Sequence, residues 1–375
     1  YSVNEIIESL DSLSKKLIKN KKAISLISQN DLGFLLAFLR KKNLNNLISL
    51  NFSSKELLDR ELNIQGNKSI FLQPKGVLVH WISGNMPVLG FISLICGVIT
   101  KNINIIKLPS SSISEFLDLF KLIISHNDFK TESYLFDSVI PLAVDKSEEN
   151  ELNLLSRIAD TRIFWGGKEG MEKITSLSRK IDANDLIMGP KLSSVIVSST
   201  HLLKLDSMNR KEIMDNIVKD VITGNQRGCN SPHFIYLFGK ESFFKKTKLI
   251  EELGRSFKEI IKKQKNSNIS STEKFKSIEE TFNFVSQEQG AVNGLIDDNF
   301  KIFLYKNSSS FESFKSPLYG NTIFVQSCSS IEEILIQSNP QTISLAVAEK
   351  DLNNIKNKLI KMGFLRIVKP GSMSA

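Results

Sequence analysis

From Gly76 onward the sequence alternates short apolar runs with amphipathic ones, and this alternation constrains the fold more than any other feature. Gly76 to Ile82 is typical of a buried strand, and the loop Ser83 to Pro87 leads into a helix. Similar runs predict further strands at 103–107, 134–142 and 161–165. Amphipathic runs predict helices at 114–124, 148–158 and 171–180. Repeated strand–helix units predict an α/β fold with a doubly wound parallel sheet.

The flanking parts of the chain differ from this pattern. Residues 1–65 are predicted to be helical, because Ile6, Leu10, Leu13 and Leu17 recur at helical spacing. A second α/β segment is predicted further on, with two strands and a long basic helix at 194–198, 234–238 and 243–263. A chain of 375 residues is long enough for two such domains.

The composition is that of a globular protein with a basic surface. Of the residues, 41% are hydrophobic and 24% charged, and the net charge is +9. The lysines are dispersed, so nucleic-acid binding is not favoured; a solvated lysine surface or a polyanionic small ligand accounts for the charge. The clean apolar run 88–99 is shorter than the roughly 20 residues that a membrane span needs, so we expect no transmembrane segment.

The three cysteines are not closely paired, which argues against a disulfide framework or a zinc site. No signal peptide is recognisable, so we expect a reducing, cytoplasmic location and no metal. Because the chain begins with Tyr1, we expect it to be processed or a fragment. Cys96 and Cys328 lie in or after apolar runs and are expected to be buried.

Cys229 lies in a different setting, the polar loop Gly224 to Pro232, which precedes the strand predicted at 234–238. The glycines of the loop allow a substrate to approach the backbone, and the adjacent Arg227 favours a thiolate. The loop alone leaves two interpretations open, a reactive thiolate and a structural cysteine.

Three loops leave predicted strand ends: Ser83 to Pro87, Leu108 to Ser112, and Gly166 to Gly170. Ligands of open parallel sheets bind at the carboxyl ends of strands. The last loop is a glycine-rich turn that opens a helix, and its backbone N–H groups suit a phosphate. A tight turn with no ligand is the alternative interpretation.

Six segments, in order, resemble those of the aldehyde dehydrogenase superfamily, and most closely its acyl-CoA reductase branch, which includes the fatty-acid reductase of bacterial luminescence. They are His80-Trp81-Ile82-Ser83-Gly84-Asn85-Met86-Pro87, Ile106-Lys107-Leu108-Pro109-Ser110, Phe164-Trp165-Gly166-Gly167, Met188-Gly189-Pro190-Lys191, Gln226-Arg227-Gly228-Cys229-Asn230-Ser231-Pro232 and Arg366-Ile367-Val368-Lys369-Pro370-Gly371. The resemblance covers the chain from about residue 70 to its end.

The resemblance implies a domain arrangement. A helical segment, 1–70, would pack on an NADP-binding Rossmann-type domain, 71–191. A catalytic domain, 192–350, would carry the cysteine, and a C-terminal segment, 351–375, would lack the tail of the family. The family also implies a homo-oligomer.

The resemblance implies roles for single residues. Cys229 would be the nucleophile, and Asn85 would donate a side-chain N–H to the oxyanion. Lys107 would bind the adenosine ribose or its 2′-phosphate. NAD-preferring relatives carry a glutamate at the position of Ser110, and the absence of that carboxylate here favours NADPH. The other expected cofactor-binding residues are Ser83, Gly166, Gly167 and Gly170.

Two carboxylates of hydrolytic aldehyde dehydrogenases are missing. Their water-activating glutamate is replaced by Ile187, which cannot act as a general base. Water would therefore not release the acyl-enzyme, and a thiol such as coenzyme A fits as the partner. Their second glutamate, near the nicotinamide ribose, is also absent, since Pro317 precedes Tyr319-Gly320.

The expected function is NADPH-dependent reduction of a fatty acyl-CoA or another acyl thioester to the aldehyde through an acyl-cysteine. An acyl-transferring enzyme is a further candidate partner. His80 and then His233 are the candidates for proton transfer, although a lone histidine at a strand end is more often structural. Asp220 is expected to be a surface charge.

Two other functions stay open: a non-acylating aldehyde dehydrogenase, and a catalytically inactive scaffold that binds acyl groups or a partner. Oxidation of free aldehyde to acid would indicate the first. A Cys229 thiol that titrates as an ordinary one and does not acylate would indicate the second.

Overall fold

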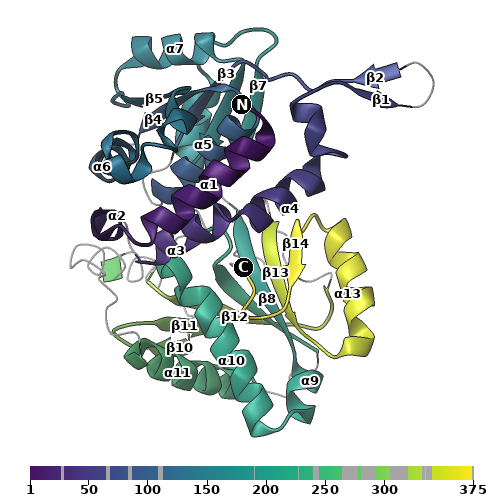
Figure 1. Cartoon of the computed structure of the whole chain (residues 1–375). Helices are drawn as coiled ribbons and strands as arrows, with labels where there is room; N and C mark the ends of the chain where they lie inside the picture. Colours follow the sequence, from purple (N-terminus) through teal and green to yellow (C-terminus); the bar gives the residue numbers. More distant parts are fainter. Residues whose placement is uncertain are drawn as a thin grey trace. The chain divides into compact units, whose positions relative to one another are not determined.

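The computed structural model of the chain describes residues 1–26, 29–64, 68–82, 87–108, 113–189, 191–226, 228–239, 245–263, 278–279, 293–304, 320–331, 334 and 340–373. The chain divides into two compact units, residues 1–190 and 191–375. Figure 1 labels helices and strands of both units where there is room.

The first unit is built on a five-stranded sheet in which every neighbouring pair is parallel. Its strands are β3 (Val77–Trp81), β4 (Ile103–Leu108), β5 (Val139–Ala143), β6 (Thr161–Trp165) and β7 (Asn184–Met188). The spatial order is β5-β4-β3-β6-β7, so the chain adds strands first on one side of β3 and then on the other. This is the doubly wound parallel sheet that the sequence predicts.

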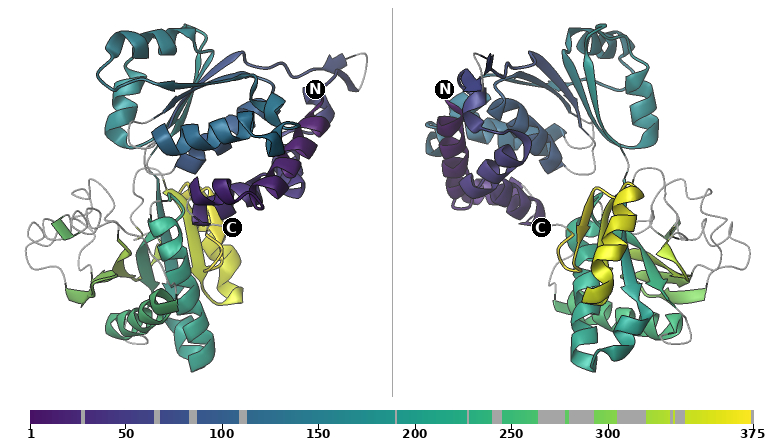
Figure 2. Two further views of the ribbon diagram at one scale, coloured as in Figure 1. Left: turned by 60° about the vertical axis from the view of Figure 1, so that its left-hand side comes forward. Right: turned by 90° about the vertical axis from the view of Figure 1, so that its right-hand side faces the viewer.

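Helices cover both faces of this sheet (Figure 2). They are α5 (Pro87–Ile99), α6 (Ile113–Ser125), α7 (Glu149–Ile158) and α8 (Lys168–Thr175). Ile106 of β4 lies in the core that contains α5 and α6, whereas the neighbouring Ile105 lies in the opposite core with Leu155 of α7. The two-residue period of a strand requires this alternation.

The N-terminal helices extend the core that contains α5 and α6. They are α1 (Val3–Leu17), α2 (Lys21–Leu26), α3 (Gln29–Phe38) and α4 (Lys41–Asn51). α1 begins at a capping box, in which the Ser2 hydroxyl accepts from the Glu5 N–H and the Glu5 carboxylate accepts from the Ser2 N–H. Leu10 and Leu17 of α1 are fully buried in the shared core. The helices predicted for residues 1–65 are therefore present as far as Asn51, whereas residues 62–64 form a strand instead.

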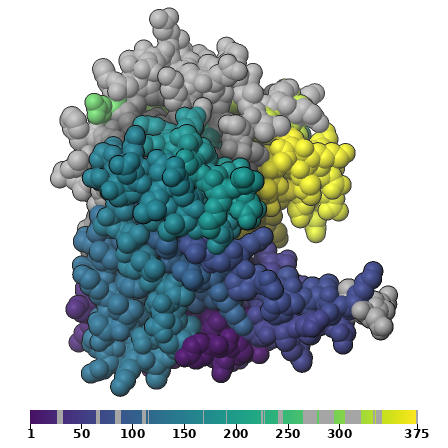
Figure 3. All heavy atoms as spheres, turned by 90° about the horizontal axis from the view of Figure 1, so that it is seen from above, coloured from purple at the N-terminus to yellow at the C-terminus, as the bar shows by residue number. Residues whose placement is uncertain are grey.

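A short hairpin follows these helices and the 3₁₀ turn η1 (Lys55–Leu58). It consists of β1 (Leu62–Ile64) and β2 (Lys68–Ile70), which pair antiparallel. All residues of β2 are exposed, and the hairpin stands away from the rest of the first unit (Figure 3).

The second unit is built on a seven-stranded sheet of order β10-β11-β12-β9-β8-β13-β14. Among the described strand pairs of this sheet, only β10–β11 is antiparallel. The strands are β8 (Leu192–Ser198), β9 (Pro232–Phe238), β10 (Asn293–Ile296), β11 (Lys301–Leu304), β12 (Thr322–Cys328), β13 (Pro340–Ala346) and β14 (Arg366–Val368). The helices are α9 (Ser199–Lys204), α10 (Ser207–Ile222), α11 (Lys246–Lys263) and α13 (Glu349–Lys361). α10 and α11 share one core, and α13 lies in the core of the opposite face.

Two predictions of secondary structure in the first unit are wrong. The strand predicted at 134–142 fails in its first half, because Ser133–Phe136 forms the 3₁₀ helix η4, which follows η3 (Asn127–Phe129). Leu135 and Phe136 are buried, and this gives a turn the apolar character of a strand. The sequence predicts no strand where β7 forms, because its residues, among them Ile187, are largely exposed and show no buried face.

The expectation of a buried Cys96 is also wrong. Cys96 is exposed on α5, and Ile92, one turn earlier in the helix, is half-buried. Cys328 is buried, as expected. Among the described residues, no helix combines the length and the hydrophobicity that crossing a bilayer requires.

Close contact between α5 and β4 depends on Gly97. A Cβ atom on residue 97 would lie 1.8 Å from Oδ1 of Asn104 and 3.2 Å from the side chain of Leu78. Asn104 is fully buried, and its Nδ2 donates to the Asn102 carbonyl at 2.8 Å. The helix can lie this close to the sheet only because residue 97 has no side chain.

We expect Gly97→Ala to destabilise the first unit by about 2 kcal/mol, because the new methyl group must displace Asn104 or push α5 from the sheet. Both tryptophans, Trp81 and Trp165, lie in this unit, so their fluorescence during urea unfolding reports its stability. Gly33→Ala is the control: no described atom would lie within 4 Å of its Cβ. Equal stability of Gly97→Ala and the wild type would contradict the close contact.

Candidate active site

Five residues in register form a row near the carboxyl ends of the strands of the first sheet. Leu142 pairs with Lys107, Lys107 with Trp81, Trp81 with Phe164, and Phe164 with Ile187. The chain segments that leave β3, β4 and β6 therefore start at one edge. The chain runs outward from β3 through β4 to β5 on one side and from β6 to β7 on the other, so the connections reverse direction between β3 and β6. Open parallel sheets bind ligands at such a switch point.

Lys107 is half-buried near the end of β4. Burial lowers the pKa of its ammonium group, and the charge of Asp145 opposes this effect. Among the described residues, none forms an ion pair with Lys107 within 4.0 Å. A lysine in this setting is suited to an anionic ligand.

The glycine turn after β6 leaves open space. Gly167 is the N-cap of α8 and has no side chain to accept from the helix N–H groups. A Cβ atom on Gly166, Gly167 or Gly170 would meet no described atom within 4 Å. Gly167 has a φ of −76°, which any residue can adopt, so backbone strain does not explain the glycine there. A helix N-terminus with no side-chain cap and open space beside its glycines is compatible with a phosphate.

His80 lies on β3 and is completely buried. Its Nδ1 is 2.7 Å from Ser93 Oγ, and its Nε2 is 3.1 Å from Asn104 Oδ1. The indole N–H of Trp165 donates to the same Ser93 oxygen at 3.1 Å, so the Ser93 hydroxyl can donate to Nδ1. An amide oxygen only accepts, so Nε2 carries the proton. The network therefore assigns a neutral imidazole in one tautomer.

The protonation equilibrium of His80 agrees with this network. Burial lowers its pKa to about 4, and the hydrogen bond to Asn104 opposes this only in part. Its Nδ1 is engaged by Ser93 of α5 and its Nε2 by Asn104 of β4, and Ser93 also links α5 to Trp165 at the end of β6. The geometry fits a residue that holds these elements together.

Three predicted site residues, Ser83, Asn85 and Ser110, lie outside the described residues. Arg227 and the segment 317–319 do as well. Their roles remain predictions. Within the part of the chain that the structure describes, no group of three or more His, Cys, Asp or Glu side chains could hold a metal ion.

Cys229 lies in the second unit, at the edge of the sheet where the parallel strands begin. We call residues 223–232, from η5 (Thr223–Gln226) to the first residue of β9, the cysteine loop. Ser193 on β8 donates its hydroxyl to the Cys229 carbonyl at 2.5 Å and accepts from the Thr342 N–H at 3.3 Å. The Thr342 hydroxyl also donates to Asn230 Oδ1 at 3.0 Å. Two strands, β8 and β13, thus fix the cysteine backbone.

Gln226 fixes the other side of the cysteine loop. It is fully buried, and its Nε2 donates to the carbonyls of Pro232 at 3.0 Å and Thr322 at 2.7 Å. Its Oε1 accepts from the Thr322 N–H at 2.7 Å. Pro232, the first residue of the neighbouring β9, has no N–H to donate to β12. The Gln226 carboxamide instead bonds the N–H and carbonyl of Thr322, the first residue of β12. Gln226 has a φ of 59°, which is uncommon for a residue with a side chain, and these hydrogen bonds hold it there.

The Cys229 residue is exposed, yet its sulfur lies among enough protein atoms for burial to raise the pKa of the thiol. The charge of Lys191 and the backbone N–H groups of Cys229 and Asn230 oppose burial and favour the thiolate. Cys96, in contrast, has a pKa raised to about 11 by burial of its sulfur, with no nearby cation in opposition. Of these two cysteines, Cys229 is the one whose thiolate form a nearby cation favours.

The expectation that Asp220 is a surface charge is wrong, because only 3% of this residue is exposed. Its carboxylate accepts from the N–H groups of Gly371 at 2.6 Å and Met373 at 3.1 Å. Arg366 donates to the carbonyls of Ser372 at 3.0 Å and Met373 at 2.8 Å. Burial raises the pKa of Asp220, while these N–H groups lower it. This aspartate and arginine together fix the last described residues against α10 and β14.

Sequence reasoning misses the side chains that hold the site in place. They are Ser93, Asn104, Ser193, Gln226 and Thr342. All are polar and fully or almost fully buried, in or beside apolar segments. Buried polar groups require partners, so a polar residue within a buried strand is the signal that could have found them.

Solved aldehyde dehydrogenases share this fold. A NAD-dependent benzaldehyde dehydrogenase from Corynebacterium glutamicum matches with a TM-score of 0.67 and 12% identity, over 99% of this chain and 82% of that one. A 1-pyrroline-5-carboxylate dehydrogenase from Thermus with bound NAD matches with a TM-score of 0.68 and 12% identity, over 100% and 75%. The predicted aldehyde dehydrogenase-like fold is confirmed.

The chain belongs to the acyl-CoA reductase (LuxC) family, whose model matches residues 2–375. Its relatives include a long-chain acyl-protein thioester reductase of Aliivibrio fischeri, 26% identical over 88% of this chain. A second such reductase, from Photobacterium leiognathi, is 27% identical over 60% of this chain. The matches span 65% and 44% of the lengths of these two relatives. The predicted family is confirmed.

The lowered pKa of His80 predicts an acid-sensitive first unit. Between pH 6.5 and about 4 the unfolded chain takes up a proton at His80 that the folded unit does not, so stability falls as the pH falls. Above pH 6.5 this effect is absent, and as the pH falls to about 4 the loss of stability grows to about 3 kcal/mol. We expect His80→Gln to remove this part of the pH dependence, measured by tryptophan fluorescence during urea unfolding at several pH values.

His126→Gln is the matched control, since His126 lies in the same unit with 44% of its side chain exposed. This variant should keep the loss of stability between pH 6.5 and 4 that His80→Gln removes. If His80→Gln kept the full wild-type dependence between pH 6.5 and 4, the neutral, buried assignment of His80 would be wrong.

Proposed function

We propose that this protein reduces a long-chain acyl thioester to the aldehyde through an acyl-enzyme on Cys229, with NADPH as the reductant. The observation that carries the proposal is the setting of Cys229: an exposed residue in a loop fixed by Ser193 and Gln226, in a chain of the acyl-CoA reductase family. Relatives named long-chain acyl-protein thioester reductases support an acyl thioester as the substrate.

The first step is attack of the Cys229 thiolate on the carbonyl carbon of the thioester. A carbon–sulfur bond forms and the carbonyl electrons move to oxygen; collapse of this intermediate breaks the bond to the donor sulfur, which leaves and takes up a proton. The loop contacts hold the cysteine backbone, so its N–H is a preorganised donor for the oxyanion. Asn85 stays a predicted second donor.

Lys191 supports the thiolate in this proposal. Its positive charge favours the ionised form of Cys229, and it directly precedes β8, whose Ser193 holds the cysteine carbonyl. The thiol pKa is raised by burial despite this charge. Acylation should therefore become faster as the pH rises and the thiolate fraction grows.

The first unit has groups that fit a phosphorylated dinucleotide. Lys107 offers a half-buried cation, and Gly166, Gly167 and Gly170 leave room beside the N-terminus of α8. NADPH, when bound, supplies the hydride equivalent that turns the acyl group into an aldehyde. Ser110, at the position of a carboxylate in NAD-preferring relatives, supports the choice of NADPH over NADH.

Ile187 supports release of an aldehyde instead of an acid. It lies in register with Phe164 at the carboxyl edge of the first sheet, and 48% of it is exposed. An apolar side chain at this position cannot deprotonate water for attack on the acyl-enzyme. The overall reaction converts an acyl thioester, NADPH and a proton to the aldehyde, a free thiol and NADP⁺.

Two acyl donors fit this chemistry, coenzyme A thioesters and a thioester carried by an acyl-transferring protein. The names of the relatives, which specify acyl-protein thioesters, favour the second. His80 takes a positioning role in the proposal, because its neutral ring is engaged on both sides and fully buried. The proton for the leaving thiol then comes from solvent or from another group.

The proposal predicts aldehyde formation from hexadecanoyl-CoA and NADPH, measured by trapping the aldehyde and by loss of NADPH absorbance. Cys229→Ala should lower the rate about a thousandfold, because the covalent route is lost. Cys96→Ala is the matched control, an exposed cysteine outside the cysteine loop, and should keep the wild-type rate within about twofold.

Other results would favour the alternatives. Wild-type aldehyde formation by Cys229→Ala would rule out the acyl-cysteine. NADP-dependent oxidation of free aldehyde to acid, without thioester reduction, would indicate a non-acylating aldehyde dehydrogenase. Tight binding of acyl thioesters with no acylation at any pH would indicate a scaffold.

A further inference from the structure

The helix that carries the glycine turn has little apolar packing of its own. Among the described side chains of α8, none is buried; Met171 and Ile174 are half-buried and the others are exposed. Ile174 touches the core of the α7 face, and the side chain of Met171 lies beside Gly189. Burial of apolar surface is the usual anchor of a surface helix, so another interaction must hold α8 in place.

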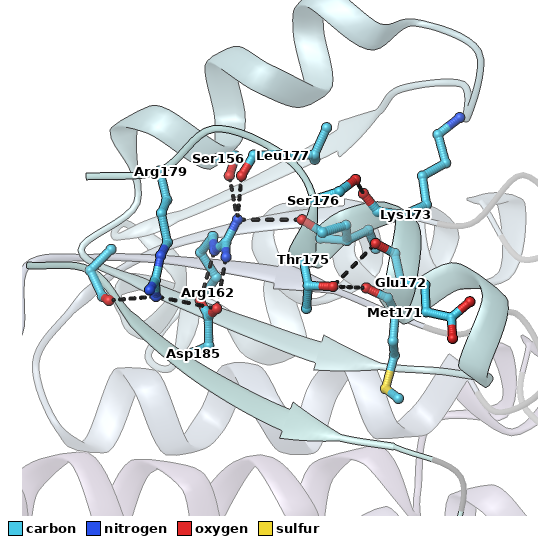
Figure 4. A network of polar contacts seen from close by, with 12 residues as sticks. Ser156, Arg162, Met171, Glu172, Lys173, Thr175, Ser176, Leu177, Arg179 and Asp185 are labelled. Carbon is cyan, nitrogen blue, oxygen red and sulfur yellow. Dashed lines mark hydrogen bonds and ion pairs between the residues drawn. The ribbon is translucent and has the colours of Figure 1, made fainter. Parts of the chain in front are cut away.

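That interaction comes from Arg162, a residue of β6 that is only 1% exposed. Its Nη1 donates to the backbone carbonyls of Ile174 at 3.3 Å and Leu177 at 3.2 Å, at the C-terminal end of α8 (Figure 4). The same nitrogen donates to the Ser156 hydroxyl of α7 at 2.8 Å. One side chain thus joins β6, α7 and the end of α8.

The charge of Arg162 is balanced by Asp185 of β7. Nε donates to Oδ1 and Nη2 to Oδ2, both at 2.7 Å, in a bidentate pair. The guanidinium also lies 5.3 Å from the ring centre of Phe164. Removal of one partner from a buried ion pair leaves an uncompensated charge, so the fold depends on both.

The chemistry of this network is specific to arginine. A planar guanidinium reaches the carboxylate with one edge and the helix carbonyls with the other, whereas the ammonium group of lysine is a single point. The cation also lies at the C-terminal end of α8, where the helix dipole favours positive charge. Arg162 consequently holds the C-terminal end of α8 to β6. The glycine turn Gly166-Gly167 lies at the other end of the helix and is fixed together with it.

We propose that Arg162 is a positioning residue for cofactor binding: held by Asp185, it fixes α8 so that the N–H groups after Gly167 are preorganised for a dinucleotide phosphate. This inference rests on the proposed function and assigns Arg162 no contact with the cofactor. It locates a determinant of cofactor affinity at the end of α8 that lies away from the glycine turn. Cys229, in the second unit, does not depend on it.

The test compares two measurements: the affinity for NADPH, and the acylation of Cys229 in the absence of the cofactor. NADPH binding is followed by energy transfer from Trp81 and Trp165, the two tryptophans of the chain, to the nicotinamide. Acylation of Cys229 is followed by intact mass with hexadecanoyl-CoA alone. For Arg162→Lys we expect the NADPH Kd to rise about tenfold or more while the extent and rate of acylation change less than twofold.

Two further variants sharpen the test. Arg179→Lys is the matched control, because Arg179 also contacts Asp185, at 3.4 Å, but has 47% of its side chain exposed and does not reach α8; its Kd should stay at the wild-type value. Asp185→Asn keeps the shape of the carboxylate without its charge, and is used should Arg162→Lys fail to fold. We expect it to raise the Kd in the same direction.

The outcomes separate this inference from the function on which it rests. Wild-type NADPH affinity in a folded Arg162→Lys or Asp185→Asn protein overturns the inference alone. Equal losses of NADPH binding and acylation would show general damage to the fold and would also overturn it. A wild-type protein that binds neither NADPH nor NADH would overturn the proposed cofactor together with the inference.

Discussion

Parallel pairing in register is the constraint on which the first unit depends. It places Lys107, Trp81, Phe164 and Ile187 side by side on neighbouring strands, although they are spread over a long stretch of sequence. The segments that leave β3, β4 and β6 must then begin at one edge, where the direction of the connections changes. The proposed binding of a dinucleotide by this unit depends on the arrangement of that edge more than on any single residue.

Buried polar side chains hold both places where chemistry is proposed. In the first unit the neutral His80 joins α5 to the sheet, and Arg162 joins α8 to it. In the second unit Gln226 and Ser193 fix the backbone around Cys229. Each of these groups would be costly to bury without its partners, so the partners are as necessary to the site as the residues that touch a substrate.

In the second unit Cys229 lies at the opposite edge of its sheet, the edge where the parallel strands begin. Ser193 near the start of β8 holds its carbonyl, and Thr342 near the start of β13 holds the neighbouring Asn230. The carboxyl-end rule for open parallel sheets therefore applies to the cofactor-binding groups proposed for the first unit and not to the cysteine. The cysteine owes its place to hydrogen bonds from the first residues of the strands.

The alternation of apolar and amphipathic runs was enough to predict the parallel sheet, and motif order was enough to predict the family. The errors have physical causes. η4 carries Leu135 and Phe136 into the core and so has the composition of a strand, while β7 is a strand whose side chains are exposed. Asp220 could not be recognised as buried, because its partners are backbone N–H groups about 150 residues further along the chain.

The intact mass of the protein after incubation with hexadecanoyl-CoA, first without and then with NADPH, tests the central claim most directly. We predict one acyl adduct that is absent from Cys229→Ala and that disappears on addition of NADPH, with release of the aldehyde. An adduct of equal yield in Cys229→Ala, or one on Cys229 that NADPH leaves unchanged, would contradict reduction through an acyl-cysteine.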